Sequence, residues 1–410
     1  MNLRRTTFSY AVILSCGGIS PSHAGAAIEQ CGQGGAIPVL GDSLNAALCS
    51  QPLGGQVDAQ KQAEWAPWTH RPYCAGTKYC VYTNAMFADG GGVSIITTPG
   101  NMSRAVGVIE KAFAEPPVAT AAPDTALPPP YVVQDVPGKG KGAIATRRIP
   151  RGEAFVTDPA AVMGAVDLLE RVAGTAGHLL LATAIDQLPD PQRVLALAGS
   201  YSAATSVAEN VMRTNTFAVS LGGEPYMALF PEISRINHAC KPNAHTRFSP
   251  RTLAMSAVAI RDIEPGEEIS ISYAEFGTTY GQRQHALLHN WGFRCTCALC
   301  TAPESELLVS DRRRRRMGQI RDGMLGLIEA RRFAEAVEAA EEMVRLVVAE
   351  GLASHLAEHY EVLARLHMAL GDGAQAVRYA RLAVADLERF GGPDDEGTLA
   401  DMREIAGRKG

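Results

Sequence analysis

Apolar residues in the last quarter of the chain recur at the three- and four-residue spacing of amphipathic helices. One pair of helices is marked by Met317, Ile320, Met324, Leu327 and Ile328, and by Val337, Ala340, Met343, Val344 and Val347. A second pair is marked by Leu363, Leu366 and Leu370, and by Val377, Ala380, Val384 and Leu387. The matching turns at 333–337 and 373–377 lie forty residues apart. We therefore predict paired antiparallel helices over residues 302–410, packed against the preceding domain.

Before residue 300, short runs rich in β-branched and aromatic residues predict strands instead. They lie at 79–82, 93–98, 143–146, 154–156, 217–220, 254–260 and 269–273. An Ala- and Leu-rich stretch at about 161–214 predicts a helical insertion, and the prolines of 115–130 predict an extended linker. The patterns divide the chain into a small module at 25–114, the linker, an α+β domain at 131–301 and an all-α tail.

The first 24 residues have the pattern of a secretory signal peptide. Arg4 and Arg5 precede an apolar core at 8–19, and Ser22-His23-Ala24 is a small-residue cleavage site. A frayed N-terminus or a misplaced start codon is the alternative. A working signal would place the protein outside the cell.

Composition excludes some classes of protein. The 410 residues are 46% hydrophobic and 20% charged, so the chain can bury a core. A net charge of −5 argues against direct nucleic-acid binding, and no apolar stretch is long enough for a membrane span. The basic run Arg312 to Arg316 is interpreted as a solvated helix start rather than a targeting signal or an anion-binding patch.

Eight of the nine cysteines follow the leader, in two groups of four. The first group contains Cys31, Cys49, Cys74 and Cys80, and its spacing favours two disulfides with three connectivities. The second contains Cys240, Cys295, Cys297 and Cys300. Either two disulfides or a metal would suit it, and we favour structural zinc because a Cys-x-Cys pair accommodates a local disulfide poorly.

Four motifs follow one another within 131–301. They are Gly-Lys-Gly-Lys-Gly at 138–142, Arg-Ile-Asn-His-Ala-Cys-Lys-Pro-Asn at 235–243, Gly-Glu-Glu-Ile-Ser-Ile-Ser-Tyr at 266–273 and Cys-Thr-Cys-Ala-Leu-Cys at 295–300. In this order they resemble the SET domain of protein-lysine methyltransferases, most closely the SET-and-MYND group. Residues 160–214 contain no cysteine, so a MYND zinc finger is absent there. The tail is similar to tetratricopeptide repeats and is either a protein-partner surface or a structural buttress.

The resemblance implies a β-rich SET domain with a helical insertion and a late zinc segment. It also implies methyl transfer from S-adenosylmethionine to a lysine of a histone or another protein. A catalytically inactive scaffold is the alternative. Family members of this kind work in the nucleus or cytoplasm, which conflicts with the secretory leader.

The resemblance also assigns roles to residues. Tyr273 would be catalytic and would orient the lysine amine, and Phe217 and Trp291 would line the lysine channel, Trp291 where the family usually has tyrosine. Cofactor contacts would come from Lys139, Gly140, Lys141, Asn215, Ser234, Asn237, His238 and Phe293. Cys240, Cys295, Cys297 and Cys300 match the zinc ligands. Glu267 and Glu268 are expected to be turn and surface residues without a chemical role.

Overall fold

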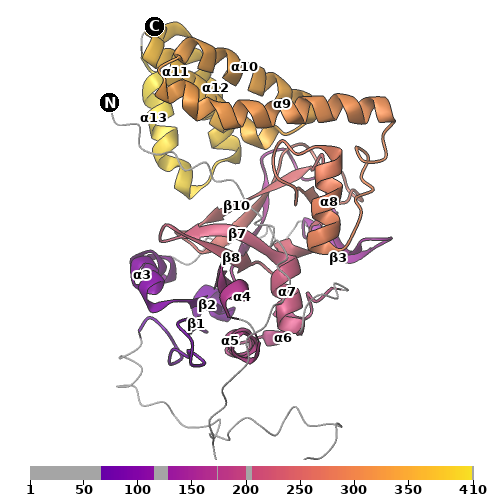
Figure 1. Cartoon of the computed structure of the whole chain (residues 1–410), viewed down its shortest axis with the longest axis vertical. Helices are drawn as coiled ribbons and strands as arrows, with labels where there is room; N and C mark the ends of the chain where they lie inside the picture. Colours follow the sequence, from indigo (N-terminus) through magenta and orange to yellow (C-terminus); the bar gives the residue numbers. More distant parts are fainter. Residues whose placement is uncertain (1–65, 115–127, 173, 200–205, 409–410) are drawn as a thin grey trace, which may run out of the picture.

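The computed structural model describes residues 66–114, 128–172, 174–199 and 206–408. The predicted leader, Cys31, Cys49 and most of the proline-rich linker lie outside these ranges. Figure 1 shows the tail helices gathered at one end of the molecule, above a body of strands and shorter helices. The predicted α+β class with a helical C-terminal region is confirmed.

The strands of the body form four sheets. The largest has the order β1-β2-β6-β8-β7 and contains Cys80–Asn84, Val93–Thr97, Val162–Ala165, Glu224–Leu229 and Thr216–Leu221. A three-stranded sheet pairs β10 (Ala244–Ser249), β11 (Ala254–Ala259) and β5 (Ala154–Pro159). Two further pairs are β3 (Tyr131–Val136) with β4 (Gly140–Ala145), and β9 (Asn237–His238) with β12 (Ser270–Ile271).

The N-terminal strands share a sheet with strands from the other side of the predicted linker. β2 runs parallel to β6, with Ser94, Ile95 and Ile96 opposite Val162, Met163 and Gly164. Cys80, at the start of β1, forms a disulfide with Cys74. The described part of 25–114 is therefore built into the body of the molecule, because β2 pairs with β6 and the apolar residues of both strands share one core.

The predicted helical insertion differs from expectation at its start. Val162–Ala165 is a fully buried strand, and the helices α4 (Leu168–Arg171), α5 (Thr175–Asp186), α6 (Pro191–Leu195) and α7 (Val207–Asn215) follow it. A short apolar run of this kind has no periodicity that separates a buried strand from a helix. The remaining helices of the body are α2 (Phe87–Gly90), α3 (Pro99–Ala114) and α8 (Tyr280–Trp291), with a 3-10 turn η1 at Ile233–Arg235.

The tail contains the predicted helices. They are α9 (Glu304–Glu329), α10 (Phe333–Glu350), α11 (Leu356–Leu370), α12 (Gly373–Phe390) and α13 (Glu396–Ala406), with 3-10 turns η2 (Ala353–His355) and η3 (Pro393–Asp395). α10 and α12 begin forty residues apart, which is the spacing of the sequence pattern. α10 and α11 end at the left-handed glycines Gly351 and Gly371, where a residue with a Cβ would be strained. Within the described ranges, no helix has the length and apolar character that a bilayer span requires.

The tail packs directly on the three-stranded sheet. The Arg247 guanidinium, on β10, donates to the carbonyls of Phe390 and Gly391 at the end of α12. The Phe390 ring also lies 6.1 Å from the His245 ring and 5.1 Å from the Arg151 guanidinium. Arg247 and His245 of β10 thus hold the end of α12 against the body.

Histidines of the tail also face the body. The ring of Phe276 lies 4.7 Å from the His355 ring and 6.2 Å from the His359 ring. Burial lowers the pKa of both His355 and His359 to about 4. The cationic forms are disfavoured because the rings face aromatic and apolar surface, so both histidines are neutral at pH 7.

These histidines predict a pH dependence of stability. Their folded-state pKa lies below the ordinary value of 6.5, so their contribution is complete above pH 6.5 and is lost as pH falls towards 4. We expect His359→Phe to reduce the loss of unfolding free energy between pH 7 and pH 4 by roughly 1–3 kcal/mol. Urea unfolding at each pH measures this, with His285→Phe as the same change at an exposed position of α8. Equal pH dependence in the two variants would contradict the assignment.

Candidate functional site

His238 links the second and third sequence motifs, and it contacts Cys240 of the late cysteine cluster. Its segment, β9, runs parallel to β12, which leads directly to Tyr273. The buried His238 ring accepts the Tyr273 backbone N–H at Nδ1, over 2.9 Å, and its Nε2 lies 3.3 Å from Cys240 Sγ. Because Nδ1 accepts a hydrogen bond, it carries no proton. The proton of the neutral ring is then on Nε2, which donates towards the sulfur. One side chain therefore connects the candidate catalytic tyrosine to the cysteine cluster.

Tyr273 lies in an aromatic cluster with its hydroxyl fixed. The hydroxyl donates to the Ile236 carbonyl over 2.7 Å. The ring centroid is 5.2 Å from Trp291 and 6.5 Å from Phe293, on the segment that leads to the late cysteines. Burial, together with the charge of Glu268, raises the pKa of Tyr273 above its ordinary value. The phenol stays protonated, and its oxygen keeps lone pairs that can accept a hydrogen bond.

Glu268 is a site residue that the sequence analysis assigned only to the surface. Its Oε2 pairs with Lys139 Nζ at 2.5 Å, and its Oε1 accepts from Asn237 Nδ2 at 3.0 Å. The carboxylate thus ties the glycine-rich turn to the Asn237-His238 pair. Its place in the Gly-Glu-Glu motif was the sequence signal for a role at the site. A glutamate close to a turn glycine, however, has the pattern of an exposed residue.

The glycine-rich segment approaches the Asn237 side chain very closely. A Cβ added at Gly142 would lie 2.5 Å from Asn237 Nδ2 and 2.7 Å from Val136 Cγ2. Lys141, in contrast, turns away and pairs with Asp135 across the β3–β4 hairpin at 2.9 Å. Gly140, the first residue of β4, follows the hairpin turn with a φ of +73°. Of Lys139, Gly140 and Lys141, the residues predicted to contact a cofactor, Lys139 is the one whose side chain pairs with another motif in the described structure.

Asn215 and Ser234 bring the ends of α7 and η1 together. Ser234 Oγ donates within reach of two carbonyls, Asn215 at 2.9 Å and Phe230 at 2.7 Å. Asn215 Nδ2 is 3.2 Å from the carbonyl of Leu197 and 2.9 Å from Thr214 Oγ1. These polar groups hold the backbone around the site.

The two predicted channel residues lie in different surroundings. Trp291 Nε1 donates to the Thr214 carbonyl over 3.0 Å, which places its ring between α7 and Tyr273. The Phe217 ring packs on Phe230 at 5.9 Å, and among described residues its ring contact is there rather than with Tyr273. Trp291 therefore joins the tyrosine cluster and Phe217 belongs to the neighbouring core.

The second cysteine group forms one compact cluster. The Sγ atoms of Cys240, Cys295, Cys297 and Cys300 all lie within 4.8 Å of one another. Cys240 Sγ is 3.5 Å from Cys300 Sγ and 3.9 Å from Cys295 Sγ, so these thiols are not joined as disulfides. Arg283, a fully buried side chain, donates from Nε to Cys240 Sγ over 3.2 Å. Four sulfurs this close, with one accepting from cationic and imidazole donors, match a tetrahedral thiolate site for a soft metal ion.

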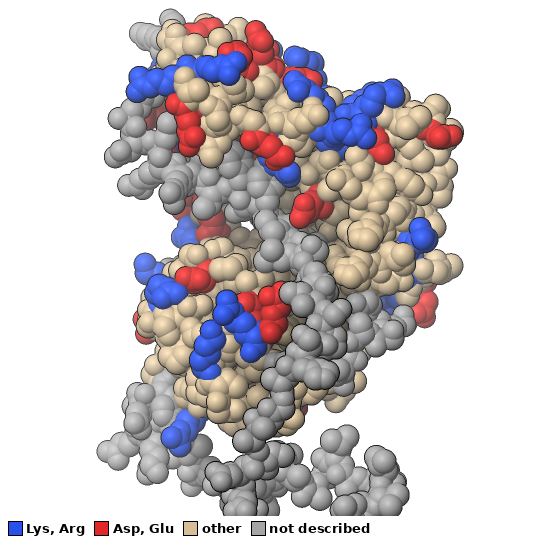
Figure 2. All heavy atoms as spheres, in the orientation of Figure 1, with Lys and Arg blue, Asp and Glu red and all other residues tan. Residues whose placement is uncertain are grey.

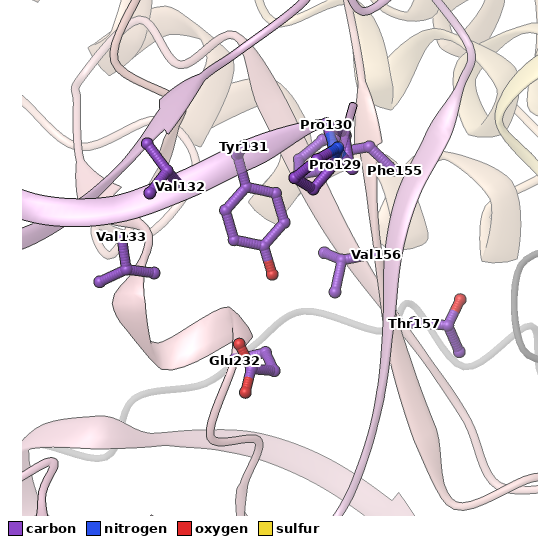
Figure 3. A pocket seen from close by; sticks show the side chains of 9 residues that line it. All are labelled: Pro129, Pro130, Tyr131, Val132, Val133, Phe155, Val156, Thr157 and Glu232. Carbon is purple, nitrogen blue, oxygen red and sulfur yellow. The ribbon is translucent and has the colours of Figure 1, made fainter. Parts of the chain in front are cut away.

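A separate hollow of about 470 Å³ opens between β3 and β5 (Figure 3). Its lining includes Tyr131, whose hydroxyl points towards Glu232, and none of the predicted cofactor residues. Behind it, buried Asp158 accepts the backbone N–H groups of Glu232 and Ile233, at 2.6 and 3.0 Å, and pairs with Arg193 of α6. Burial raises the pKa of Asp158 to about 7. Asp158 thus holds η1, the turn that leads into Asn237, in place.

Comparison with known proteins agrees with this arrangement. Residues 140–274 match the SET domain family. The chain is 29% identical over 189 residues to histone-lysine N-methyltransferase set5 of Schizosaccharomyces pombe, covering 46% of this chain and 56% of that protein. It is 36% identical over 87 residues to human histone-lysine N-methyltransferase SMYD3, covering 21% of this chain and 20% of that protein. Mouse protein-lysine N-trimethyltransferase SMYD5 is 40% identical over 77 residues, 18% of each chain.

Residues 140–274, which run from the glycine-rich turn to just beyond Tyr273, thus form a SET domain. The chain is similar to set5 and to the SMYD methyltransferases, and the likeness to SET-domain methyltransferases is the one that the sequence motifs predicted. It spans about half the length of the fission-yeast relative and a fifth or less of the two mammalian ones.

The close approach at Gly142 predicts a specific intolerance. We expect Gly142→Ala to lower the unfolding free energy by roughly 1–3 kcal/mol, because the new methyl group overlaps the Asn237 amide and Val136. Chemical denaturation measures the change. Gly281→Ala, in the first turn of α8 where nothing lies within 4 Å of the new Cβ, is the control and should be neutral or stabilising. Similar stability of the two variants would show that β4 can move away from Asn237.

Proposed function

We propose that the protein is an S-adenosylmethionine-dependent protein-lysine N-methyltransferase. The observation that carries the proposal is the contact of His238 with both Tyr273 and Cys240, which links two motifs of the matched SET region to the cysteine cluster. The names of the relatives refer to lysine methylation of histones and other proteins. We therefore propose a lysine of a histone or another protein as the acceptor, and the nucleus or cytoplasm as the compartment.

The residues around Tyr273 suit a cofactor with an adenine ring and a charged amino-acid end. Phe293 offers an aromatic face beside His238, with ring centroids 6.4 Å apart. Gly142, which has no side chain, lets the glycine-rich strand approach the Asn237 amide closely. We assign Lys139, Gly140, Asn215, Ser234, Asn237, His238 and Phe293 to this cofactor, and Lys141 to the same turn. When bound, S-adenosylmethionine supplies a methyl group on a positively charged sulfur.

Tyr273 orients the acceptor rather than removing its proton. Its hydroxyl hydrogen is engaged by the Ile236 carbonyl, so its oxygen is left to accept an N–H of a neutral lysine amine. That hydrogen bond directs the amine lone pair along the line of displacement. Because the pKa of Tyr273 is raised, the phenol is a poor base. Desolvation in the aromatic channel beside Trp291 disfavours the ammonium form of lysine and so provides the neutral amine.

The four cysteines are proposed to bind one structural zinc ion with no open coordination position. Gln284 holds the Cys295 backbone at both its N–H and its carbonyl, at 3.0 and 2.8 Å, so α8 presents the late cysteines to Cys240. The metal would fix the 291–301 segment, and with it Trp291 and Phe293, over the site. The helical tail, whose repeat pattern is similar to tetratricopeptide repeats, is proposed as a surface for a protein partner.

One observation favours a second candidate, an inactive SET scaffold. The side chains of Asn215 and Ser234 already donate hydrogen bonds to backbone and side-chain acceptors of the protein. Few of their donor hydrogens therefore remain for a ligand. A scaffold would bind protein partners through the tail and would not bind S-adenosylmethionine. Calorimetric titration of the full chain with S-adenosylmethionine separates the two functions.

The orienting role of Tyr273 predicts a defect in turnover rather than in cofactor binding. We expect Tyr273→Phe to lower kcat roughly 10–100-fold, because the amine loses its hydrogen-bond acceptor. Its Kd for S-adenosylmethionine should stay within about twofold of the wild type, since the ring still packs on Trp291 and His238. Radiolabelled methyl transfer to a histone mixture and calorimetry measure the two quantities. Unchanged turnover would remove Tyr273 from the mechanism.

The cysteine cluster predicts stoichiometric metal. We expect the purified chain to contain about one zinc ion, and Cys300→Ser to lose it, since a tetrahedral structural site needs all four ligands. Elemental analysis by mass spectrometry measures the content. The double variant Cys74→Ser/Cys80→Ser, which removes only the disulfide, is the matched control and should keep its metal. Zinc retained by Cys300→Ser would contradict the ligand set.

A further inference from the structure

The basic run at 312–316 does not face water throughout. Arg312, Arg315 and Arg316 are exposed, whereas the side chain of Arg314 is buried, with 4% of its surface accessible. The expectation of a solvated helix start is therefore wrong. α9 begins at Glu304, eight residues before the run, and the Arg314 side chain turns towards Cys240 rather than towards water.

Arg314 connects the tail to the cysteine cluster. Its Nη2 donates to the backbone carbonyl of Cys240 over 2.8 Å, and its Nε donates to Glu350 Oε2 over 2.9 Å. Glu350, the last residue of α10, is completely buried and also accepts from Ser310 Oγ at 2.6 Å. A continuous set of hydrogen bonds thus runs from two tail helices to the backbone of one proposed zinc ligand.

Stability alone does not explain a buried ion pair at this place. Removing an arginine and a glutamate from water is unfavourable, and apolar residues of similar size often give an equally stable fold. What apolar residues could not supply is a donor for the Cys240 carbonyl. The contact with Cys240 therefore distinguishes this pair from a replaceable part of the tail core.

Cys240 is also the ligand most in need of support. Cys295, Cys297 and Cys300 lie within six residues on one local turn, whereas Cys240 comes from the Asn237-His238 segment, fifty-five residues before Cys295. The cluster closes only if the backbone of Cys240 stays at the correct distance from that turn. Arg283 and His238 hold its sulfur, and Arg314 holds its carbonyl.

We propose that Arg314, fixed by Glu350, is a positioning residue by which the helical tail keeps Cys240 in the four-cysteine metal site. The inference rests on the proposed zinc but not on methyltransferase activity. It assigns the tail a second task besides binding partners, namely to retain the metal and hence the 291–301 segment above Tyr273. Mutation of a residue that hydrogen-bonds to a metal ligand commonly lowers metal affinity by about 10- to 100-fold.

The test is the rate at which the full chain loses zinc. Zinc transfer to the chromogenic chelator 4-(2-pyridylazo)resorcinol is followed well below the unfolding temperature. We expect Arg314→Met to release zinc about tenfold faster than the wild type or more. The double variant Arg314→Met/Glu350→Met, which leaves no unpaired buried charge, should release zinc equally fast while its Tm returns towards that of the wild type.

Two controls separate positioning from general destabilisation. Arg315→Met makes the same change at the exposed neighbouring position and should release zinc at the wild-type rate. Leu363→Ala creates a cavity in the tail core, away from Cys240, and should lower Tm without accelerating zinc release. Equal acceleration by Leu363→Ala and Arg314→Met at matched Tm loss would overturn the proposal, as would wild-type release from Arg314→Met.

The same preparations keep the two proposals apart. Wild-type chain that holds zinc but gives no calorimetric signal with S-adenosylmethionine would end the methyltransferase proposal and leave the role of Arg314 standing. Cofactor binding combined with unchanged zinc release from Arg314→Met would do the reverse. Wild-type chain without zinc would overturn the metal site and the positioning role together.

Discussion

The site depends on the orientation of one imidazole ring. His238 accepts the Tyr273 N–H at one nitrogen and faces Cys240 Sγ with the other. The first hydrogen bond fixes the tautomer, and the tautomer makes the second nitrogen a donor. Hydrogen bonds from His238 and Arg283 stabilise negative charge on the Cys240 sulfur, and a thiolate is the form that binds a metal ion. The candidate catalytic residue and the candidate metal ligand are thereby placed by the same side chain, each two residues beyond a strand that is only two residues long.

Such short strands cannot hold themselves in register, so their surroundings must do so. Asp158 caps η1 immediately before β9, and Glu268 binds Asn237 from the β12 side. Arg314 holds the carbonyl of Cys240 immediately after β9. The three supports come from β5, from the Gly-Glu-Glu turn and from the tail, so elements distant in sequence are needed to define one four-residue segment.

Local patterns predicted much of this architecture. The periodicity of apolar residues predicted the tail helices and their forty-residue spacing. The spacing of the late cysteines predicted the cluster. Contacts between distant parts of the chain could not be predicted from the sequence. The pairing of β2 with β6 leaves no local signal, and a buried strand such as β6 has the composition of a helix. Arg314 and Glu268 have the sequence character of surface residues, and only the fold shows which residues they contact.

The tail touches the body at several separated places, and this restricts how it can act. α9 reaches Cys240 through Arg314, and the end of α12 is held by Arg247 through the carbonyls of Phe390 and Gly391. Asp311 of α9 also accepts the Tyr280 N–H at the start of α8, over 2.6 Å, next to the turn that carries the late cysteines. Figure 2 shows one face of the molecule, on which both basic and acidic side chains lie on the tail and on the body. Contacts at several separated places restrict rotation of the tail relative to the body. A partner of the kind proposed for the tail would therefore be held at a nearly fixed distance from Tyr273.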